Sequence, residues 1–466
     1  MSITSVMLVS AEPIKVARQY LKERFVSGDG AQTIWTIADQ TWVWYGDKWT
    51  CYDKKTLQAD MMVWLEDSKI EMADGSRKRF VVYPKKVEDI ATCLAAITRR
   101  EGELPPMWMG GPEGVDPRWC VAFEDVVVHI KEDGRLETFE RSPKWVDNVV
   151  VPCTWEEAQK VETPVWDKAM ETWSGGDEAW QERAIRWVGY SLPAYREYAK
   201  WLHPFGKSRS GKTTYTEVIR WLVGSNACIE RTMKTLSKKY GTRGILQSRI
   251  LLVSEVTQLE RGDGEVVEGI LKQILGRNEV ESERKYEDAI YHKSNAAPIL
   301  VGNQMVLLPD SNKGLTSKML MLPFAGSHLG HEDYELGEKL REELPGIAYK
   351  AVQALVRLKL APHAEKWPVP AKEAQLVGRL RGKTHVGHAF LDGRFVQVGK
   401  GFVPFRTLWA EWARYQTELG ERVPLSRRQL YDWIEDTSGW DVYRGEHAGN
   451  RGFWGMGVKR TQEAAH

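Results

Sequence analysis

The sequence is poor in the features that mark secreted, membrane-spanning and zinc-binding proteins. Its five cysteines are scattered along 466 residues without a CxxC pair, which argues against a zinc site and a disulfide framework. The apolar start, MSITSVMLVSAEP, lacks a basic leader and a small-residue cleavage site, and no long uncharged apolar run follows it. We therefore expect no signal peptide, no membrane contact and a reducing cytoplasm.

The sequence also lacks an excess of charge of either sign. The 65 Lys and Arg residues against 64 Asp and Glu leave a formal net charge of +1. No global field draws such a chain onto nucleic acid, so any contact must come from local patches. With 42% hydrophobic and 28% charged residues, the chain is globular and too long for one ordinary core. Internal repeats and low-complexity tracts are absent from the sequence as well.

Loop-like segments rich in proline or glycine divide the chain into blocks. They occur at Gly102–Pro117, near Pro152 and at Ala361–Glu373. The expected blocks are residues 1–154, 155–360, 361–400 and 401–466. The first block mixes short alternating strands with a helix, which indicates an α+β domain. The second alternates apolar strands with longer helices and is typical of an α/β sheet. The third is a linker, and the fourth contains two helices and a hairpin.

The most specific motif is a glycine-rich loop. Gly206–Thr213 (GKSRSGKT) satisfies the pattern GxxxxGK[ST], and the helical run TTYTEVIRWLV accompanies it. In such a loop, backbone N–H groups hold the phosphates of ATP, the Lys212 ammonium neutralises them and the Thr213 hydroxyl ligates Mg²⁺. The expected nucleotide contacts are Gly206, Ser208, Ser210, Gly211, Lys212, Thr213 and Thr214. A chance glycine-rich turn is the alternative, and Pro204 interrupts the short strand expected before the loop.

Two further apolar strands end in polar residues. Ile250–Val253 leads to Glu255, a carboxylate that would polarise the attacking water and help to place Mg²⁺. A later strand ends near Asn303, whose amide can both donate to a γ-phosphate oxygen and accept from the water. Because the carboxyl ends of parallel strands meet at one edge of a sheet, both groups should lie beside the loop. Ordinary surface turns remain the alternative for each of them.

Five stretches in one order resemble the superfamily 3 family of phage and plasmid primase-helicases, which includes the poxvirus primase-helicase. They are WVGYSLPA, GKSRSGKTT, ILLVSEV, LKQILGRNEVESERKY with PILVGNQ, and MLMLPF with EELPGI. The resemblance runs approximately from Val121 to Val458. It implies an α/β fold with an AAA+ P-loop ATPase core, preceded by an α+β N-terminal collar domain and followed by a C-terminal winged helix.

The same resemblance implies an ATP-hydrolysing DNA helicase that uses Mg²⁺ and acts in replication of a phage or mobile element, in the cytoplasm of a bacterial host. Such proteins assemble into a ring, usually a hexamer, on single-stranded and forked DNA. A separate primase or polymerase is a further candidate partner. An alternative function is an origin-binding initiator that melts DNA with ATP as a switch. A third is a P-loop scaffold with little turnover.

The resemblance also assigns residues to DNA. The turn Gly276–Asn278 falls just before the hairpin that grips DNA in relatives, and basic residues of that hairpin would follow phosphates without reading bases. Two arginines of the winged helix are candidates for a second contact. The DNA-binding candidates are Arg284, Lys285 and Lys293 in the hairpin, and Arg427 and Arg428 in the winged helix. The alternatives are a solvated charge run for the hairpin and a protein-docking module for the last block.

The sequence departs from the family at the arginine finger. Relatives carry a pair of arginines before the apolar strand that ends in Pro-Phe, whereas Ser317 and Lys318 stand there in this chain. Lys318 is therefore the candidate finger, although a lysine lacks the forked geometry of a guanidinium group. The block before Trp155 resembles only the collar of relatives and shows no acidic triad for primase metals, so we expect no priming activity.

Overall fold

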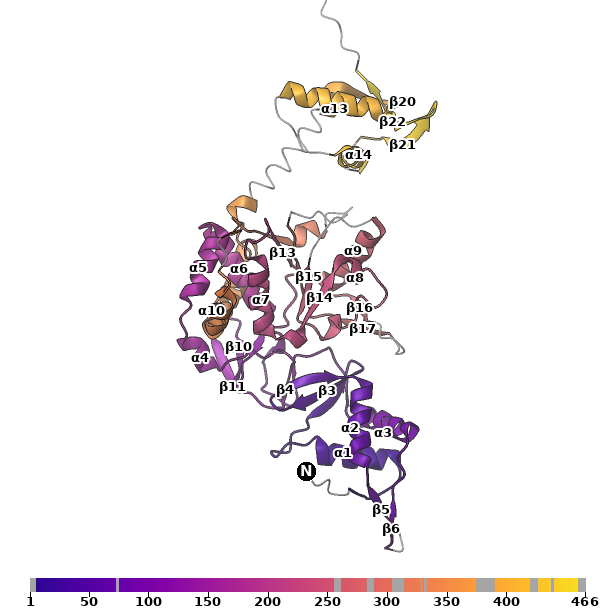
Figure 1. The fold of residues 1–466 in the computed structure, drawn as a ribbon, viewed down its shortest axis with the longest axis vertical. Helices are drawn as coiled ribbons and strands as arrows, with labels where there is room; N and C mark the ends of the chain where they lie inside the picture. The colour runs from indigo at the N-terminus through magenta and orange to yellow at the C-terminus, as the bar shows by residue number, and fades with distance from the viewer. Residues whose placement is uncertain are drawn as a thin grey trace, which may run out of the picture. The chain divides into compact units, whose positions relative to one another are not determined.

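In the computed structural model the chain consists of two compact units, Met1–Pro370 and Ala371–His466, and Figure 1 labels many of their helices and strands. The described residues are 6–72, 75–254, 261–282, 289–303, 314–327, 329–330, 333–373, 390–419, 426–436 and 440–459. Both units combine helices with small sheets, so the predicted mixed α/β class is confirmed. No helix among these residues is long and apolar enough to cross a membrane.

The N-terminal part of the first unit mixes helices with short strands, the α+β pattern predicted for residues 1–154. Its helices are α1 (Pro13–Arg24), α2 (Lys54–Leu65) and α3 (Pro84–Ile97). One sheet has the order β4-β3-β2-β7 and a smaller one the order β1-β5-β6. The strand bounds are β1 Met7–Leu8, β2 Ile34–Ile37, β3 Gln40–Tyr45, β4 Lys48–Tyr52, β5 Lys69–Glu71, β6 Arg77–Arg79 and β7 Arg99–Arg100. Asp53 starts α2 by accepting a hydrogen bond from the Thr56 N–H at 2.8 Å, as an N-cap residue does.

A small antiparallel sheet and three helices come next in the chain, and two helices from the end of the first unit, α10 and α11, pack against these helices. The sheet has the order β11-β10-β9, and β8 and β12 form a separate pair. The bounds are β8 Met107–Trp108, β9 Cys120–Ala122, β10 Val126–Ile130, β11 Leu136–Glu140, β12 Trp145–Val146, α4 Trp155–Lys160, α5 Pro164–Ser174, α6 Glu178–Ser191, α10 Leu336–Glu342 and α11 Leu344–Leu360. One hydrophobic core includes Val128 and Ile130 of β10, Trp187 of α6 and Leu355 of α11. This core therefore runs across the boundary expected at residue 154.

A parallel five-stranded sheet forms the centre of the first unit. Its order is β14-β15-β18-β13-β19, with β13 Trp201–Phe205, β14 Cys228–Thr232, β15 Ile250–Ser254, β18 Ala297–Leu300 and β19 Met319–Pro323. The middle strands are mostly apolar and almost entirely buried because both faces of the sheet are covered, and His203 is the buried polar residue of β13. Pro204 does not end β13, and its carbonyl accepts a hydrogen bond from the Gly302 N–H at 3.1 Å. The carboxyl ends of β13, β15 and β18 consequently meet at one edge.

Three helices and a separate two-stranded hairpin accompany the central sheet. They are α7 (Lys212–Val223), α8 (Met233–Leu236), α9 (Arg261–Leu275), β16 (Glu279–Ser282) and β17 (Ile290–Lys293). The last two pair in antiparallel register from Glu279 opposite Lys293 to Ser282 opposite Ile290. The hairpin predicted after the Gly276–Asn278 turn is thus present. Helix α7 follows the glycine-rich loop directly, as the motif predicts.

A buried ion pair ties the segment after β12 to the central sheet. Arg249 donates from Nη2 to both carboxylate oxygens of Asp147, at 2.8 and 3.0 Å, and from Nη1 to the Leu192 carbonyl at 2.9 Å. The side chains of Arg249 and Asp147 are only 2% and 3% exposed. Two charges withdrawn from water in this way depend on each other, because either one alone would be a buried uncompensated ion.

The second unit is a small α/β module. Its three-stranded antiparallel sheet has the order β20-β22-β21. The bounds are β20 Phe395–Pro404, α13 Phe405–Leu419, α14 Arg427–Asp436, β21 Tyr443–His447 and β22 Asn450–Val458. Leu408, Trp412, Leu430 and Phe453 are among the residues of its own hydrophobic core. The helices and the hairpin lie where the sequence predicts them, whereas β20 begins inside the segment 361–400 that was expected to be a linker.

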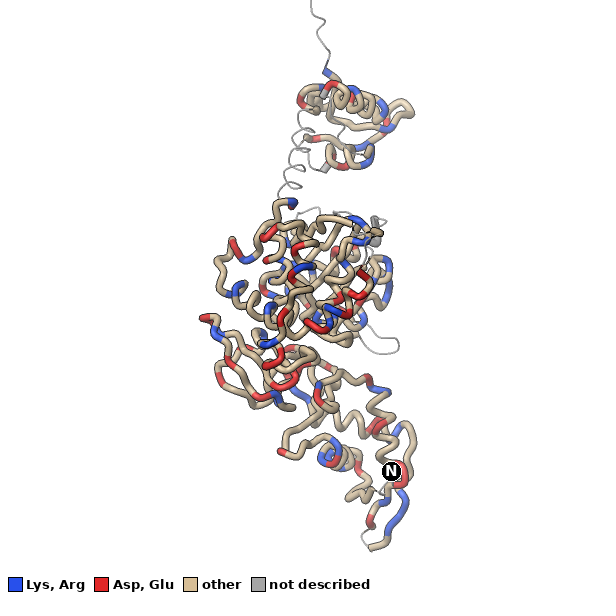
Figure 2. The backbone as a smooth tube through the Cα atoms, turned by 60° about the vertical axis from the view of Figure 1, so that its left-hand side comes forward, with Lys and Arg blue, Asp and Glu red and all other residues tan. Residues whose placement is uncertain are grey.

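Charged residues of both signs are interspersed along both units, as Figure 2 shows. This distribution agrees with the formal net charge of +1. Any attraction of a polyanion must therefore be sought in particular clusters of side chains.

Candidate functional site

The glycine-rich loop lies between the carboxyl end of β13 and the first residue of α7. Gly206 and Gly211 have φ angles of +150° and +96°, which residues with a Cβ atom rarely adopt. Helix α7 begins at Lys212, and no side chain caps it. The N–H groups of its first turn therefore have no helical partner and point toward the loop, an arrangement that favours an anion.

Lys212 is held inside this loop. Its Nζ donates to the carbonyls of Gly206 and Lys207 at 2.8 and 2.7 Å, and to Ser210 Oγ at 3.2 Å. The residue is 7% exposed, and burial lowers the pKa of its ammonium group. It forms no ion pair within the described part of the chain. The loop thus concentrates a positive charge that is solvated by neutral oxygens alone, which is the chemistry required to attract phosphate.

Trp173 supports the loop from outside the motif. This residue of α5 is 2% exposed, and its carbonyl accepts a hydrogen bond from the Ala325 N–H at 2.8 Å. A Cβ atom added to Gly211 would lie 2.1 Å from the Trp173 indole nitrogen. On another side, Ser327 Oγ donates to the Ser208 carbonyl at 2.8 Å. Neither contact could be predicted from the glycine-rich motif, because α5 and the segment after β19 carry no part of it.

Replacing Gly211 with alanine should lower the affinity for ATP about tenfold and destabilise the fold, because the new methyl group collides with Trp173. The matched control is Gly244→Ala, at a glycine whose φ and ψ of +87° and −7° are close to the +96° and −1° of Gly211, and whose added Cβ meets only the flexible end of the Ile229 side chain at 3.1 Å. Both variants carry the backbone strain of about 1 to 2 kcal/mol, and the collision should add about 1 to 3 kcal/mol at Gly211 alone. Titration calorimetry with a non-hydrolysable ATP analogue and thermal unfolding measure the two effects. Equal losses in both variants would contradict the contact.

Asn303 lies beside the loop, at the same edge of the sheet. It is exposed and follows Gly302, which pairs with Phe205 in a parallel bridge. The Val301 N–H donates to the Val253 carbonyl at 2.8 Å. The end of β15 at Ser254 therefore lies next to the end of β18, from which the chain continues to Asn303. The Thr213 side chain is exposed on the first turn of α7 and makes no hydrogen bond to the described residues. Glu255 lies outside the described residues, and its role stays a prediction.

Lys318 lies at the amino ends of the strands, whereas the glycine-rich loop lies at their carboxyl ends. The register of β13 and β19 pairs Trp201 with Met319 and Phe205 with Pro323, so Lys318 adjoins the amino end of β13 and the loop adjoins its carboxyl end. A strand of this length spans about 16 Å. Trp201 Nε1 fixes the turn that carries Lys318 by donating to the Leu315 carbonyl at 2.9 Å. Lys318 is therefore remote from the loop of its own chain.

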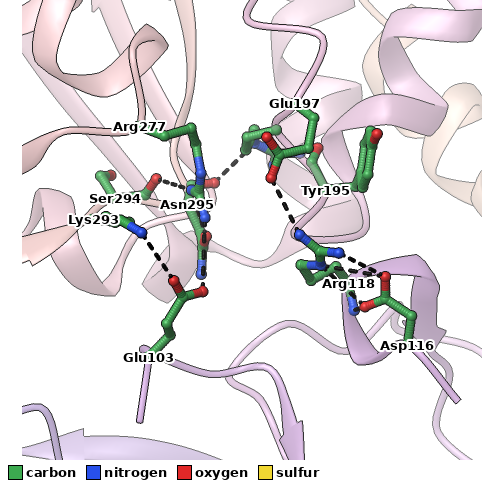
Figure 3. A network of polar contacts seen from close by, with 10 residues as sticks. Glu103, Asp116, Arg118, Tyr195, Glu197, Arg277, Lys293, Ser294 and Asn295 are labelled. Atoms are coloured by element: carbon green, nitrogen blue, oxygen red, sulfur yellow. Dashed lines mark hydrogen bonds and ion pairs between the residues drawn. The ribbon is translucent and has the colours of Figure 1, made fainter. Parts of the chain in front are cut away.

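A polar joint connects the base of the β16–β17 hairpin to the N-terminal part of the unit. We use this name for Glu103, Pro105, Arg277, Lys293 and Asn295, and Figure 3 labels the four of them other than Pro105. Lys293 Nζ lies 3.3 Å from Glu103 Oε1, Arg277 Nη2 lies 4.0 Å from Glu103 Oε2, and Asn295 Nδ2 donates to the Pro105 carbonyl at 3.0 Å. Arg284 and Lys285 lie outside the described residues. Of the hairpin cations expected to face DNA, Lys293 has a carboxylate partner that the sequence did not reveal.

Arg427 and Arg428 begin α14 and are both exposed. The Arg427 guanidinium lies 5.2 Å from the centre of the Trp409 ring, and Arg428 Nε lies 3.7 Å from Asp432 Oδ2. Asp432 also pairs with Arg444. The first turn of α14 therefore presents two cations to solvent, one of them partly balanced by a carboxylate.

One family model matches the part of the chain that contains the loop. A model described as a family of unknown function (DUF5906) matches residues 205–316, from the end of β13 to the turn before β19 and less than half of the chain. No curated protein matches the sequence.

Among solved structures, the chain is similar to the C-terminal region of NrS-1. Its A form apo structure has a TM-score of 0.50 and 13% sequence identity, with 96% of this chain and 99% of that chain covered. A second apo structure of the same region gives a TM-score of 0.48 and 13% identity, with 96% and 100% covered. The first of these comparisons indicates a shared fold over nearly the whole chain.

Proposed function

We propose that this chain is an ATP-hydrolysing, ring-forming DNA helicase of the superfamily 3 type that acts in replication of a phage or mobile element. The observation that carries the proposal is the grouping of the Lys212 loop, the end of β15 and Asn303 at one edge of a parallel sheet. The strand order, with β18 between β13 and β15, brings the groups together and supports an AAA+ core. The second unit, with helices α13 and α14 and a three-stranded antiparallel sheet, supports the proposal of a C-terminal winged helix.

The residues of the glycine-rich loop are suited to bind the phosphates of a nucleoside triphosphate. On binding, Lys212 would exchange two carbonyls and the Ser210 hydroxyl for phosphate oxygens, while the first turn of α7 donates N–H groups. The exposed Thr213 hydroxyl would hold Mg²⁺, which keeps several waters and needs few protein ligands besides phosphates. Asn303 and Glu255 would orient the attacking water from the neighbouring strand ends.

The position of Lys318 supports assembly into a ring. Because this lysine lies at the amino edge of the sheet and the loop at the carboxyl edge, it can serve only the loop of another copy. A head-to-tail interface that closes on itself gives every loop such a neighbour. A hexameric ring on single-stranded and forked DNA, with the β16–β17 hairpin and the start of α14 as DNA contacts, follows from the same proposal. A separate primase or polymerase remains a proposed partner.

Strand displacement tests the proposal directly. The full chain with ATP and Mg²⁺ should separate forked DNA of unrelated sequences, whereas Glu255→Gln should bind ATP, hydrolyse it about 10²-fold more slowly and separate nothing. Glu178→Gln makes the same change at an exposed position at the start of α6 and should match the wild type. Hydrolysis at the wild-type rate in Glu255→Gln would sink the assignment. Protection of a single duplex site without strand separation would favour the initiator instead.

A further inference from the structure

The sheet β20-β22-β21 of the second unit (Figure 1) has one face covered by helices and one face that its own helices leave open. Side chains alternate between the two faces along a strand. Phe453 of β22 is buried in the core that also contains residues of α13 and α14, so Trp454 lies on the opposite face. The register pairs Trp454 with Phe402 on one neighbouring strand and with Tyr443 on the other. Three aromatic residues therefore cross the open face in one row.

Two glycines allow the rings to lie close against the sheet. Gly445 and Gly452 are paired with each other on the open face. A Cβ atom added to Gly445 would lie 2.6 Å from Trp454 Cδ1, and one added to Gly452 would lie 2.7 Å from Phe402 Cζ. Each ring thus lies over a glycine of the neighbouring strand, where no side chain stands beneath it. Its outer side is left open to a ligand.

His447 extends this group of rings. Its ring centre lies 5.5 Å from that of Phe402 and 5.2 Å from that of Trp454, and the centres of Phe402 and Trp454 are 5.0 Å apart. Tyr443 is 60% exposed. We call these four residues, Phe402, Tyr443, His447 and Trp454, the aromatic face. Contiguous aromatic surface of this kind on the outside of a small module marks a place where a partner binds.

The aromatic face offers hydrogen-bond donors without charged neighbours on its own side of β21 and β22. Tyr443 Oη, Trp454 Nε1 and the His447 ring form no hydrogen bond with the residues that the structure describes. The charged residues of these two strands alternate with the aromatic ones. Arg444 pairs with Phe453 in register and forms ion pairs with α14, and Glu446 stands opposite Arg451.

We propose that the aromatic face binds a proline-rich segment of a partner protein in the polyproline II conformation. Such a segment has no internal hydrogen bonds, so its carbonyls can accept from Tyr443, Trp454 and His447. Its apolar rings carry no charge and pack on exposed aromatic side chains. Complementarity of charge favours this ligand over nucleic acid, whose phosphates would need cations on the same face. The inference goes beyond the proposed helicase function and does not depend on it.

The probe is a fluorescently labelled decaproline peptide, and anisotropy measures its binding to the full chain without ATP or DNA. Decaproline should bind saturably, whereas a glycine–serine peptide of the same length should not, because its flexible chain is not preorganised. Trp454→Leu should weaken binding at least about tenfold, the loss expected of a tryptophan anchor. Tyr443→Phe removes only the hydroxyl group and should weaken binding about three- to tenfold, the contribution of one hydrogen bond.

Tyr45→Phe makes the same change at another exposed tyrosine, at the end of β3 in the first unit, and should leave binding unaltered. Lys400→Gln removes an exposed cation of β20 from the stretch where its register shifts, and should also leave decaproline binding unaltered. Raising the salt concentration should change the affinity less than about twofold, because no ion pair forms on binding.

The assignment is wrong if decaproline does not bind, if the glycine–serine peptide binds equally well, or if Tyr443→Phe behaves like Tyr45→Phe. Binding of labelled oligothymidylate that is lost in Trp454→Leu, without binding of decaproline, would make the face a nucleic-acid surface. Loss of self-association in Trp454→Leu during sedimentation, again without binding of decaproline, would assign the face to a second copy of the chain. Thermal unfolding identifies a variant that has lost its fold, and His447→Ala, at an exposed position, then replaces Trp454→Leu.

Discussion

Replacement of Lys212 with alanine should slow ATP hydrolysis roughly 10³-fold, in the range found when one charged or polar group that stabilises a transition state is removed. The lysine is the cation that the loop encloses, with neutral oxygens of Gly206, Lys207 and Ser210 as its partners. Its removal deletes the charge that faces the phosphates both before and during their transfer. Nucleotide affinity should therefore fall together with turnover, which steady-state kinetics and calorimetry measure separately.

Lys207→Ala is the matched control for this prediction. Lys207 belongs to the same loop, but its side chain is exposed. Its backbone carbonyl, and not its side chain, accepts a hydrogen bond from the Lys212 ammonium group. The same change of charge at this position should alter hydrolysis less than about threefold, as expected of a screened surface cation. Comparable losses in the two variants would mean that net charge near the loop, and not the enclosed ammonium group, governs activity.

Replacement of Asp147 with alanine should lower the free energy of unfolding by about 3 to 5 kcal/mol, because it strands the Arg249 charge in the interior. Arg249 is 2% exposed, and among the described residues its side chain keeps one other hydrogen bond, to the Leu192 carbonyl. Chemical denaturation of the full chain, followed by tryptophan fluorescence, measures the loss. The expected result is a shift of the midpoint without a change in slope, since the surface exposed on unfolding is the same.

Two comparisons show whether burial causes this loss. Asp167→Ala breaks an exposed pair in which Lys350 Nζ lies 2.5 Å from the carboxylate, and should cost less than about 1 kcal/mol. The double variant Asp147→Leu with Arg249→Met removes both charges and should recover much of the stability lost in Asp147→Ala. If the double variant is less stable than Asp147→Ala, the pair contributes more than the mutual neutralisation of two buried ions.

Local sequence patterns predicted those features of the fold that local physics determines. The glycine spacing of Gly206–Thr213 specified both the loop and the helix that follows it, and the apolar run Ile250–Val253 specified β15. In the second unit, Ser426 marked the start of α14, where its Oγ accepts a hydrogen bond from the Gln429 N–H at 3.3 Å. Capping residues, turn residues and periodicity act over a few positions, so they can be read without knowledge of the tertiary structure.

Features that depend on distant packing could not be predicted in this way. The contact of Trp173 with Gly211, the pairing of Asp147 with Arg249 and the insertion of β18 between β13 and β15 join segments far apart in the chain. Strand β20 was missed for a different reason. Its sequence, FVQVGKGFVP, contains two glycines that suggest a loop, whereas its register shifts between Gln397 and Phe402 and so accommodates them.

The polar joint at the base of the β16–β17 hairpin has a mechanical consequence. The legs of the hairpin are joined by a ladder of backbone hydrogen bonds, and Arg277 adds a bond of 2.8 Å to the Ser294 carbonyl. By contrast, Lys293 reaches the N-terminal part through Glu103, and these two side chains are 48% and 64% exposed. Exposed ion pairs contribute at most about 1 kcal/mol and weaken as salt rises. Salt therefore weakens the ion pairs of the joint, whereas the neutral hydrogen bond from Asn295 Nδ2 to the Pro105 carbonyl remains. Ionic strength should thus set how firmly the base of the hairpin is attached without detaching it.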